Sequence, residues 1–398
     1  MSQKYISTGQ LLIVQYGNNY FSSFLRFLLF FSLAEMFKAI FLVALSTILP
    51  FSQLAAASTC KASRASPLQY VGVDWSSAIV EERDNGVVYK DAQGVVKPLE
   101  TILVEAGVNM VRQRVFTVDG DYGIDYNIKL ARRASNAGLK FGLNLHFSDT
   151  WTNPDLQDIP TGWPTDIDGL ERTLWNYVTE VANTFYSEGL WPETITIGNE
   201  IPNGILWPTG YFENPENLSR LLHTAAQAVR QSPLGSRTKI LIHLAHGYNQ
   251  ELQNWFYDLV LAPGYLKLDD WDVSAVSFYP FWGEGATMQN LTDSLNHLAT
   301  KYNKEVQVVE TNWPTSCPNP DYAFPADQLD IPFTPAGQAQ YLRLLADTLK
   351  AIPAATGLNY WEPAWINNAV LGSSCEANVL FDPSGKAYDS LAALGTLL

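Results

Sequence analysis

Histidine and cysteine are scarce in this chain. Its 398 residues include only five histidines and three cysteines. The histidines form no HExxH pattern, and three cysteines cannot supply the paired spacing of a zinc site. The sequence therefore indicates no structural zinc site, and we expect no cofactor.

Basic residues are also few. The chain has 25 Lys and Arg against 40 Asp and Glu, a formal net charge of −15, and a sequence pI of about 4.7. Because nucleic-acid phosphates favour Lys and Arg, this balance argues against a nucleic-acid partner. It fits a soluble, secreted protein.

The first 57 residues differ from the rest of the chain. A short basic region begins at Met36, residues 39–49 are apolar, and Ala57 closes a run of small residues suited to cleavage. We interpret residues 1–57 as an N-terminal extension with a secretory signal peptide that starts at Met36. The alternative is an uncleaved membrane anchor. Pro50 interrupts the stretch, however, and a spanning helix needs about 20 apolar residues. We therefore expect cleavage, an extracellular location and no stable membrane association.

Residues 58–67 are expected to form a short linker, and residues 68–398 a single domain. Cys317 and Cys375 lie in loop-like surroundings, WPTSCPNP and LGSSCEAN. They are the natural disulfide pair in an oxidising compartment, which leaves Cys60 alone near the processing site.

Strand-like and helix-like segments alternate from residue 68 onward. The expected strands are 69–73, 109–115, 140–147, 194–198, 239–244, 273–278, 306–309 and 357–360. The expected helices are 98–106, 126–137, 170–187, 215–231, 251–261, 288–302 and 335–351, with a weaker one at 388–394. Parallel strands need such crossover helices. Eight repeats predict a closed (β/α)₈ TIM barrel of the α/β class. No GxGxxG follows the first strand, which argues against a dinucleotide-binding sheet.

The stretch 194–201, TITIGNEI, is a short buried strand that delivers Glu200 to its carboxyl end. The strand 306–309 delivers Glu310 in the same way. A buried carboxylate costs free energy unless it is hydrogen-bonded or used. Two such glutamates on the fourth and seventh strands indicate one shared site.

Barrel enzymes carry their chemistry at the carboxyl ends of the strands. Polar and aromatic side chains gather at those ends here. They are Asp74, Trp75, Arg112, Gln113, Arg114, His146, Asp149, Trp151, Asn199, Glu200, His243, His246, Tyr279, Glu310, Trp313, Trp361 and Glu362. This concentration predicts an active site.

Two carboxylates facing each other can hydrolyse a glycosidic bond, one as the acid and the other to stabilise or attack the anomeric carbon. Glu200 needs a raised pKa to act as the acid. We expect Arg114 and Tyr279 to hold Glu310 ionised. Asn199 is placed to hydrogen-bond a substrate hydroxyl. His146 either contacts the sugar or tunes the acid; the competing interpretation is a core histidine bonded to backbone.

The ordered motifs resemble one family. They are GVDWSS (72–77), VRQRVF (111–116), HFSDTW (146–151), IGNEI (197–201), SFYPF (277–281), VVETNWP (308–314), SCPNP (316–320), YWEPAW (360–365) and LGSSC (371–375). The chain resembles the arabinogalactan endo-β-1,4-galactanases of glycoside hydrolase family 53, in their fungal form.

That resemblance implies a retaining barrel enzyme that cuts β-1,4-galactan internally, with Glu200 as acid/base and Glu310 as nucleophile. It implies substrate-binding roles for Arg114, His146, Trp151, Asn199, Tyr279, Trp313 and Trp361, and a disulfide between Cys317 and Cys375. Bacterial members hold calcium, but no dense Asp/Asn cluster occurs here, so we expect no metal. We also expect a monomer. N-glycosylation is permitted at Asn217 and Asn290.

Two rival functions remain open from the residues alone. Another retaining barrel glycanase, such as a β-mannanase or cellulase, would use the same pair of glutamates. A non-catalytic carbohydrate-binding barrel would be expected to lack one of the two carboxylates, yet both are present.

The signal-peptide interpretation predicts the start of the mature protein. Cleavage after the small residues that end at Ala57 should give a secreted chain that begins near Ser58. N-terminal sequencing of the secreted protein measures this directly. A mature chain that starts before Met36 would contradict the interpretation.

Overall fold

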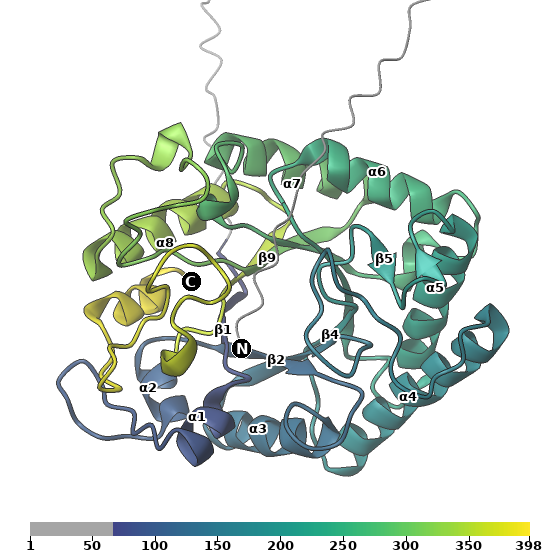
Figure 1. Cartoon of the computed structure of the whole chain (residues 1–398), viewed down its shortest axis with the longest axis horizontal. Helices are drawn as coiled ribbons and strands as arrows, with labels where there is room; N and C mark the ends of the chain where they lie inside the picture. The colour runs from purple at the N-terminus through teal and green to yellow at the C-terminus, as the bar shows by residue number, and fades with distance from the viewer. Residues whose placement is uncertain (1–66) are drawn as a thin grey trace, which may run out of the picture. The chain divides into compact units, whose positions relative to one another are not determined.

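The structure, a computed structural model, describes residues 67–398. Parallel strands close into a barrel in which each strand pairs with its neighbours (Figure 1). In order around the barrel they are β1 (Tyr70–Asp74), β2 (Met110–Val115), β3 (Lys140–Leu145), β4 (Thr194–Ile197), β7 (Lys239–Leu244), β8 (Val273–Ser277), β9 (Glu305–Glu310) and β10 (Ala355–Tyr360). The predicted (β/α)₈ barrel is confirmed. The predicted signal peptide and Cys60 lie outside the described residues.

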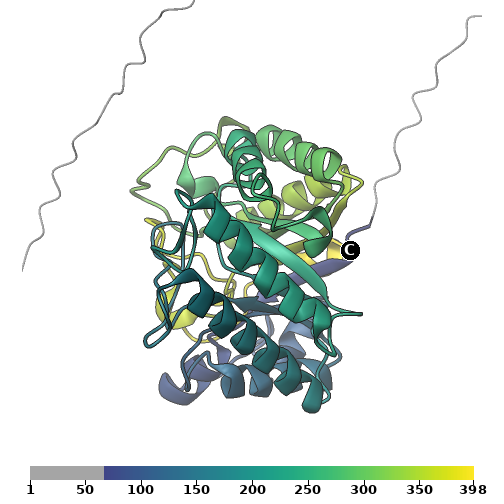
Figure 2. The ribbon, with the colours of Figure 1, turned by 90° about the vertical axis from the view of Figure 1, so that its right-hand side faces the viewer.

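Helices surround the barrel (Figures 1 and 2). They are α1 (Ala78–Asp84), α2 (Leu99–Glu105), α3 (Ile124–Asn136), α4 (Ile167–Ser187), α5 (Pro215–Gln231), α6 (Gln250–Leu261), α7 (Met288–Tyr302) and α8 (Pro335–Lys350). The short helices η1 (Leu268–Asp270), η2 (Pro280–Trp282), η3 (Ala326–Gln328) and η4 (Ile366–Asn368) lie in the loops. No helix within residues 67–398 is long and apolar enough to cross a membrane.

Several short elements differ from the sequence-based prediction. Helix α1 and the small hairpin of β5 (Gly204–Ile205) and β6 (Gly210–Tyr211) were not predicted. The segment predicted as a final α-helix is the 3-10 helix η5 (Asp389–Thr396). These pieces span only a few residues each, too short to show a clear periodicity.

Local signals account for where the long helices begin. The Asp166 side chain accepts a hydrogen bond from the backbone N–H of Gly169 and caps α4. Thr334 caps α8 in the same way, and Pro335 follows at the first helical position. Both arrangements satisfy backbone donors that have no partner inside a helix.

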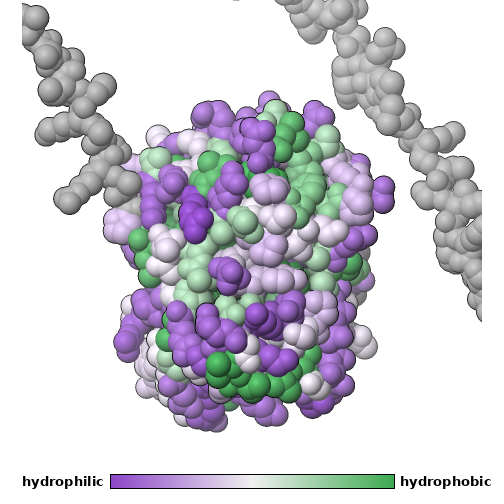
Figure 3. Space-filling view, turned by 90° about the vertical axis from the view of Figure 1, so that its left-hand side faces the viewer, coloured by the Kyte–Doolittle hydropathy of each residue, from purple (hydrophilic) through white to green (hydrophobic). Residues whose placement is uncertain are grey.

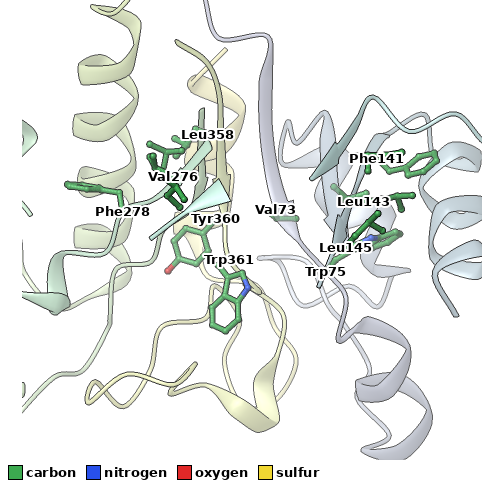
Figure 4. Close-up of a cluster of buried hydrophobic side chains, with 14 of the residues drawn as sticks. Val73, Trp75, Phe141, Leu143, Leu145, Val276, Phe278, Leu358, Tyr360 and Trp361 are labelled. Carbon is green, nitrogen blue, oxygen red and sulfur yellow. The ribbon is translucent and has the colours of Figure 1, made fainter. Parts of the chain in front are cut away.

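Successive side chains along each strand point alternately outward to the helices and inward to the barrel, and they form two separate hydrophobic clusters. In β2, Val111 and Val115 point outward and pack beneath the helices, whereas Arg112 and Arg114 point into the barrel. The outward side chains of all strands join the helices in the main hydrophobic core, part of which Figure 4 shows. A smaller cluster forms apart from it, from Leu241, Val273, Ala275 and Val309.

A bulge in β9 breaks this alternation beside the expected site. Val276 of β8 pairs with Val308, but the next residue, Ser277, pairs with Glu310. The register therefore shifts by one residue. Since Val309 belongs to the smaller, inner cluster, regular alternation would turn Glu310 outward. The bulge turns it into the barrel mouth instead, where it meets Arg112.

The outer surface carries scattered hydrophobic side chains. Figure 3 shows one face on which they form small groups among hydrophilic residues. The exposed examples include Val88, Val95 and Val96 in the segment between α1 and α2. Single exposed apolar residues are ordinary on folded proteins.

The predicted disulfide is present. Cys317 follows β9 and Cys375 follows β10, and their sulfur atoms are bonded across a separation of 58 residues. The bond therefore ties together two loops at the carboxyl end of the barrel.

Removal of this bond should destabilise the protein. For a closed loop of this length, the chain-entropy model gives a loss of up to about 4 kcal/mol. We expect the Cys317→Ser/Cys375→Ser variant to lose about 2–4 kcal/mol in free energy of unfolding. Chemical denaturation measures it. A reductant should weaken the parent protein but not the variant, and equal stabilities of the two proteins would contradict the prediction.

Candidate active site

A left-handed turn after β4 presents Glu200. Gly198 has φ +98°, and Glu200 itself has φ +47°. A side chain at Gly198 would bring its Cβ to 2.8 Å from Ile201 Cγ2, so the close turn requires glycine. Gln157 donates hydrogen bonds to the carbonyl oxygens of Asn199 (2.8 Å) and Glu200 (3.3 Å). Strained backbone held by a neighbouring side chain is typical of functional positions.

Glu310 accepts hydrogen bonds at both carboxylate oxygens. Arg112 donates to Oε1 at 2.8 Å, and the Tyr279 hydroxyl donates to Oε2 at 3.0 Å. The Ser277 hydroxyl lies 3.4 Å from Oε2. Burial, and then the charge of Glu310, raises the pKa of Tyr279 well above its ordinary value, so Tyr279 stays protonated as a donor. The predicted contact between Tyr279 and Glu310 is present.

The predicted contact between Arg114 and Glu310 is wrong, because Arg112 takes that place. The guanidinium of Arg112 also donates to Asp74 Oδ2 (2.9 Å) and to Asn199 Oδ1 (3.1 Å). One buried cation therefore joins two carboxylates and the residue that precedes Glu200. Arg112 and Arg114 are two positions apart on one strand and share a face, so the sequence did not separate their roles.

His243 links Arg112 to Ser277. The backbone N–H of Glu200 and the guanidinium of Arg112 lie 3.4 and 3.3 Å from Nδ1, and both can only donate. Nδ1 also lies 3.1 Å from Asn199 Oδ1, and Nε2 lies 2.8 Å from the Ser277 hydroxyl oxygen. Burial, and then Arg112, holds the pKa of His243 well below its usual value, so the ring is neutral.

The two glutamates lie close together. Glu200, His243 and Glu310 each offer one ligand-type atom, and these atoms all lie within 4.8 Å of one another. Such a group resembles a cation site. Arg112, at 2.8 Å from Glu310 and 3.3 Å from His243 Nδ1, already supplies the positive charge. The expectation of no metal stays a prediction.

The environments of the carboxyl groups differ. Burial, and then the charge of Glu310, raises the pKa of Glu200 from 4.5 to about 8. Within residues 67–398, no Lys or Arg forms an ion pair with Glu200. Burial, against the opposing charge of Arg112 and with the charges of Glu310 and Glu362, raises the pKa of Asp74 to about 8. A glutamate with a raised pKa beside a hydrogen-bonded carboxylate is the division expected between an acid and a nucleophile.

A narrow pocket opens over Glu310. Its lining includes several of the predicted binding residues, and the full set is Asp74, Arg112, Arg114, Asn144, His146, Trp151, Asn199, Glu310 and Trp361. Asn199 is held on both sides, because its Nδ2 donates to the Thr152 carbonyl (2.9 Å) and its Oδ1 accepts from Asn144 (2.8 Å).

His146 is bonded to backbone, as a core histidine would be, and also lies in the pocket lining, as a sugar-contacting histidine would. Its Nδ1 accepts from the backbone N–H of Thr152 at 3.1 Å, so the ring is bonded to backbone as a core histidine would be. Its Nε2 lies 3.2 Å from Asn144 Nδ2, and the residue lines the pocket. Burial, and then Arg114 and Arg112, keeps the pKa of His146 well below its usual value.

Trp313 does not line the cleft, and that prediction is wrong. Its side chain is fully buried behind β9, where it stacks on Tyr341 of α8 with ring centroids 5.0 Å apart. Its indole N–H donates to the Pro332 carbonyl oxygen at 3.1 Å. The indole thus anchors α8 to the barrel.

Several residues of the site were not assigned a role from the sequence. Arg112, Asp74, His243 and Glu362 were recognised only as members of the strand ends. Arg112 and Arg114 share the inner face of β2, and the deeper position of Arg112, two residues earlier on the strand, is the one signal that could have separated their roles.

The two N-glycosylation candidates differ in exposure. Both are third residues of helices, as predicted: Asn217 in α5 and Asn290 in α7. Asn290 is exposed. Asn217 is half-buried and donates to the Thr209 carbonyl, and Ser219 of the same tripeptide is fully buried.

The raised pKa of Glu200 predicts a stability effect. Ionising this side chain in the folded state costs free energy between pH 4.5 and about pH 8, so stability is lost as pH rises through that range. Glu200→Gln should therefore be more stable than the parent at pH 7, by about 1–3 kcal/mol, and equal to it near pH 4. Denaturation at both pH values measures the difference. The exposed Glu213→Gln is the control, and a Glu200→Gln variant less stable at pH 7 would contradict the prediction.

Comparisons with known proteins agree with this geometry. The family model described as Glycosyl hydrolase family 53 matches residues 70–394. An arabinogalactan endo-beta-1,4-galactanase of Humicola insolens is 52% identical over 327 residues, which cover 82% of this chain and 98% of that protein. The enzyme of the same name from Thermothelomyces thermophilus is 50% identical, with the same coverage.

Solved structures show the same relationship. A fungal beta-1,4-galactanase structure has a TM-score of 0.81 and 51% identity, and the match covers 83% of this chain and 99% of that one. The family 53 catalytic domain of Ignisphaera aggregans has a TM-score of 0.72 at 29% identity, over 83% of this chain and 96% of that one. The chain therefore belongs to glycosyl hydrolase family 53.

Proposed function

We propose that this protein is an arabinogalactan endo-β-1,4-galactanase that hydrolyses internal β-1,4-galactosidic bonds with retention of configuration. The observation that carries the chemistry is the pair of Glu200 and Glu310, whose nearest oxygens lie within 4.8 Å of each other. Carboxyl groups of retaining glycosidases lie about 5–5.5 Å apart, against roughly 6.5–9.5 Å in inverting ones. The substrate follows from the relatives, two of which carry that name at 50–52% identity.

In the first step, Glu310 attacks the anomeric carbon while Glu200 donates its proton to the departing glycosidic oxygen. The carbon–oxygen bond to the leaving sugar breaks, and an ester to Glu310 forms. The raised pKa of Glu200 keeps that proton available at neutral pH. Arg112 and Tyr279 hold Glu310 in position for attack through the bonds at 2.8 and 3.0 Å.

In the second step, Glu200 acts as a base. It takes a proton from a water molecule, whose oxygen attacks the anomeric carbon and displaces Glu310 as a carboxylate. The same two donors, Arg112 and Tyr279, stabilise the charge that returns to Glu310. Asn199, fixed by Arg112 and Thr152, is placed to hold the hydroxyl beside the reacting carbon.

Arg114, His146, Trp151 and Trp361 are proposed to bind the rest of the galactan chain, since all four line the pocket. The protein is proposed to act outside the cell as a monomer, without a metal or cofactor. Of the two glycosylation candidates, the exposed Asn290 is the better acceptor.

A substrate comparison tests the function. We expect rapid hydrolysis of β-1,4-galactan and little of mannan or carboxymethylcellulose, measured as new reducing ends. Viscosity should fall early, because internal cuts shorten the polymer quickly. The first product observed by NMR should be the β-anomer.

The Glu310→Ala variant is the matched control for these assays. Loss of the covalent nucleophile should lower kcat by roughly 10⁴-fold or more. Binding of galacto-oligosaccharides should persist. Equal activity on mannan, an α-anomeric first product, or an active Glu310→Ala variant would each overturn a separate part of the proposal.

A further inference from the structure

A further buried carboxylate, Glu362, lies two residues beyond the end of β10. Its side chain has no exposed surface and its backbone has φ +44°. It accepts hydrogen bonds from the backbone N–H (3.2 Å) and the hydroxyl (2.5 Å) of Ser77, and from Nη1 of Arg114 at 2.7 Å. The catalytic steps proposed above do not use this residue. Its contacts fix Arg114 from one side.

Aromatic rings fix Arg114 from other directions. The central carbon of its guanidinium lies 4.5 Å from the ring centroid of Tyr122, 4.7 Å from that of Trp151 and 4.8 Å from that of Trp365. Stacking against ring faces leaves the N–H groups of a planar guanidinium to point outward from its edge. Arg114 therefore has its faces covered and one N–H group bonded to Glu362.

The remaining donors of Arg114 are unused. Within the described part of the chain, neither Nε nor Nη2 has a hydrogen-bond partner, although both atoms are buried. Buried donors are almost always bonded, so a site with two open ones points to a ligand. Arg114 lines the pocket with Trp151 and Trp361. It also lies two residues beyond Arg112 on β2, about 7 Å further along the strand toward the mouth of the barrel.

We propose that Glu362 is a positioning residue that holds Arg114 so that its Nε and Nη2 groups donate to oxygen atoms of a bound, uncharged galactosyl residue. The inference rests on the proposed galactanase function. The charge of Arg114 is already balanced by Glu362, and Asp74 and Glu310 lie in the same pocket. The Glu362–Arg114 pair thus offers hydrogen-bond donors without excess positive charge. It favours neutral hydroxyl or ring oxygens over the carboxylate of a uronic acid.

The test compares Arg114→Lys with Arg133→Lys. Lysine at position 114 keeps the charge beside Glu362 but loses the planar donors. Arg133 is the control, because it too forms ion pairs with glutamate, here Glu82 and Glu100, and lies over an indole ring, that of Trp75, but does not line the pocket. Galactotetraose binding is measured by calorimetry, with both changes made in a Glu200→Gln background to prevent turnover.

We expect Arg114→Lys to weaken galactotetraose binding about 10- to 100-fold, the loss that accompanies removal of hydrogen bonds from a charged donor. Arg133→Lys should bind within about twofold of its parent, even if its melting temperature falls. With Glu200 intact, Arg114→Lys should raise KM far more than it lowers kcat. Tetragalacturonate should not bind the parent.

Glu362→Gln tests the positioning role itself. It should weaken galactotetraose binding in the same direction as Arg114→Lys, and unchanged binding would overturn the positioning role. If Glu362→Gln fails to fold, Ser77→Ala, which removes one hydrogen bond to Glu362, tests the same role. Unchanged binding in Arg114→Lys, equal losses in both lysine variants, or tight tetragalacturonate binding would overturn the inference. If the wild-type protein cuts galactan while Arg114→Lys binds normally, only this inference fails. If the wild-type protein does not cut galactan, the proposed function fails.

Discussion

The site depends on one buried guanidinium. Arg112 binds Asp74 and Glu310 with one nitrogen and Asn199 with the other, and His243 lies against the second nitrogen. Removing any one partner would leave a charge or a donor buried without compensation, which costs more than an exposed ion pair is worth. The arrangement therefore fixes the nucleophile, the residue before the acid and the neutral histidine as one unit. Pre-organisation of this kind is what stabilises charge during a reaction in a buried site.

Backbone irregularities put the two glutamates where that cation can act on the pair. Glu200 reaches the mouth through a left-handed turn that requires Gly198, and Glu310 does so through the bulge that shifts β9 against β8. Regular strands would aim Glu310 at the helices, by the period of two along a strand. Such local strain costs free energy, and burial of the strands in a large core offsets that cost. Residues on both faces of the strands are buried.

The fold was predictable because its signals repeat. Eight strands and their helices each carry an apolar pattern and a start or stop residue, so an error in one element does not change the topology. The glutamate pair was predictable because both follow strands, and barrel strands end at one face. The roles of Arg112 and Trp313 were not. Arg112 and Arg114 share a face and differ only in depth. Trp313 follows the bulge, whose position a single sequence does not reveal, and the direction of every side chain after it depends on that extra residue.

The two arginines of β2 lie at different depths in the barrel and make different contacts. Arg112 lies deeper in the barrel, where its terminal nitrogens contact Asp74, Asn199 and Glu310, whereas Arg114 lies two residues further along β2 with two donors still open. The two terminal nitrogens of the lower guanidinium bond to protein groups, among them Glu310 and Asn199, and only its Nε has no partner among the described residues. The upper one is held by Glu362 and by ring faces, which immobilise it without using up its donors. Two arginines that lie two positions apart on β2 can thus have different roles. Arg112 supports the reaction, and Arg114 recognises the sugar chain.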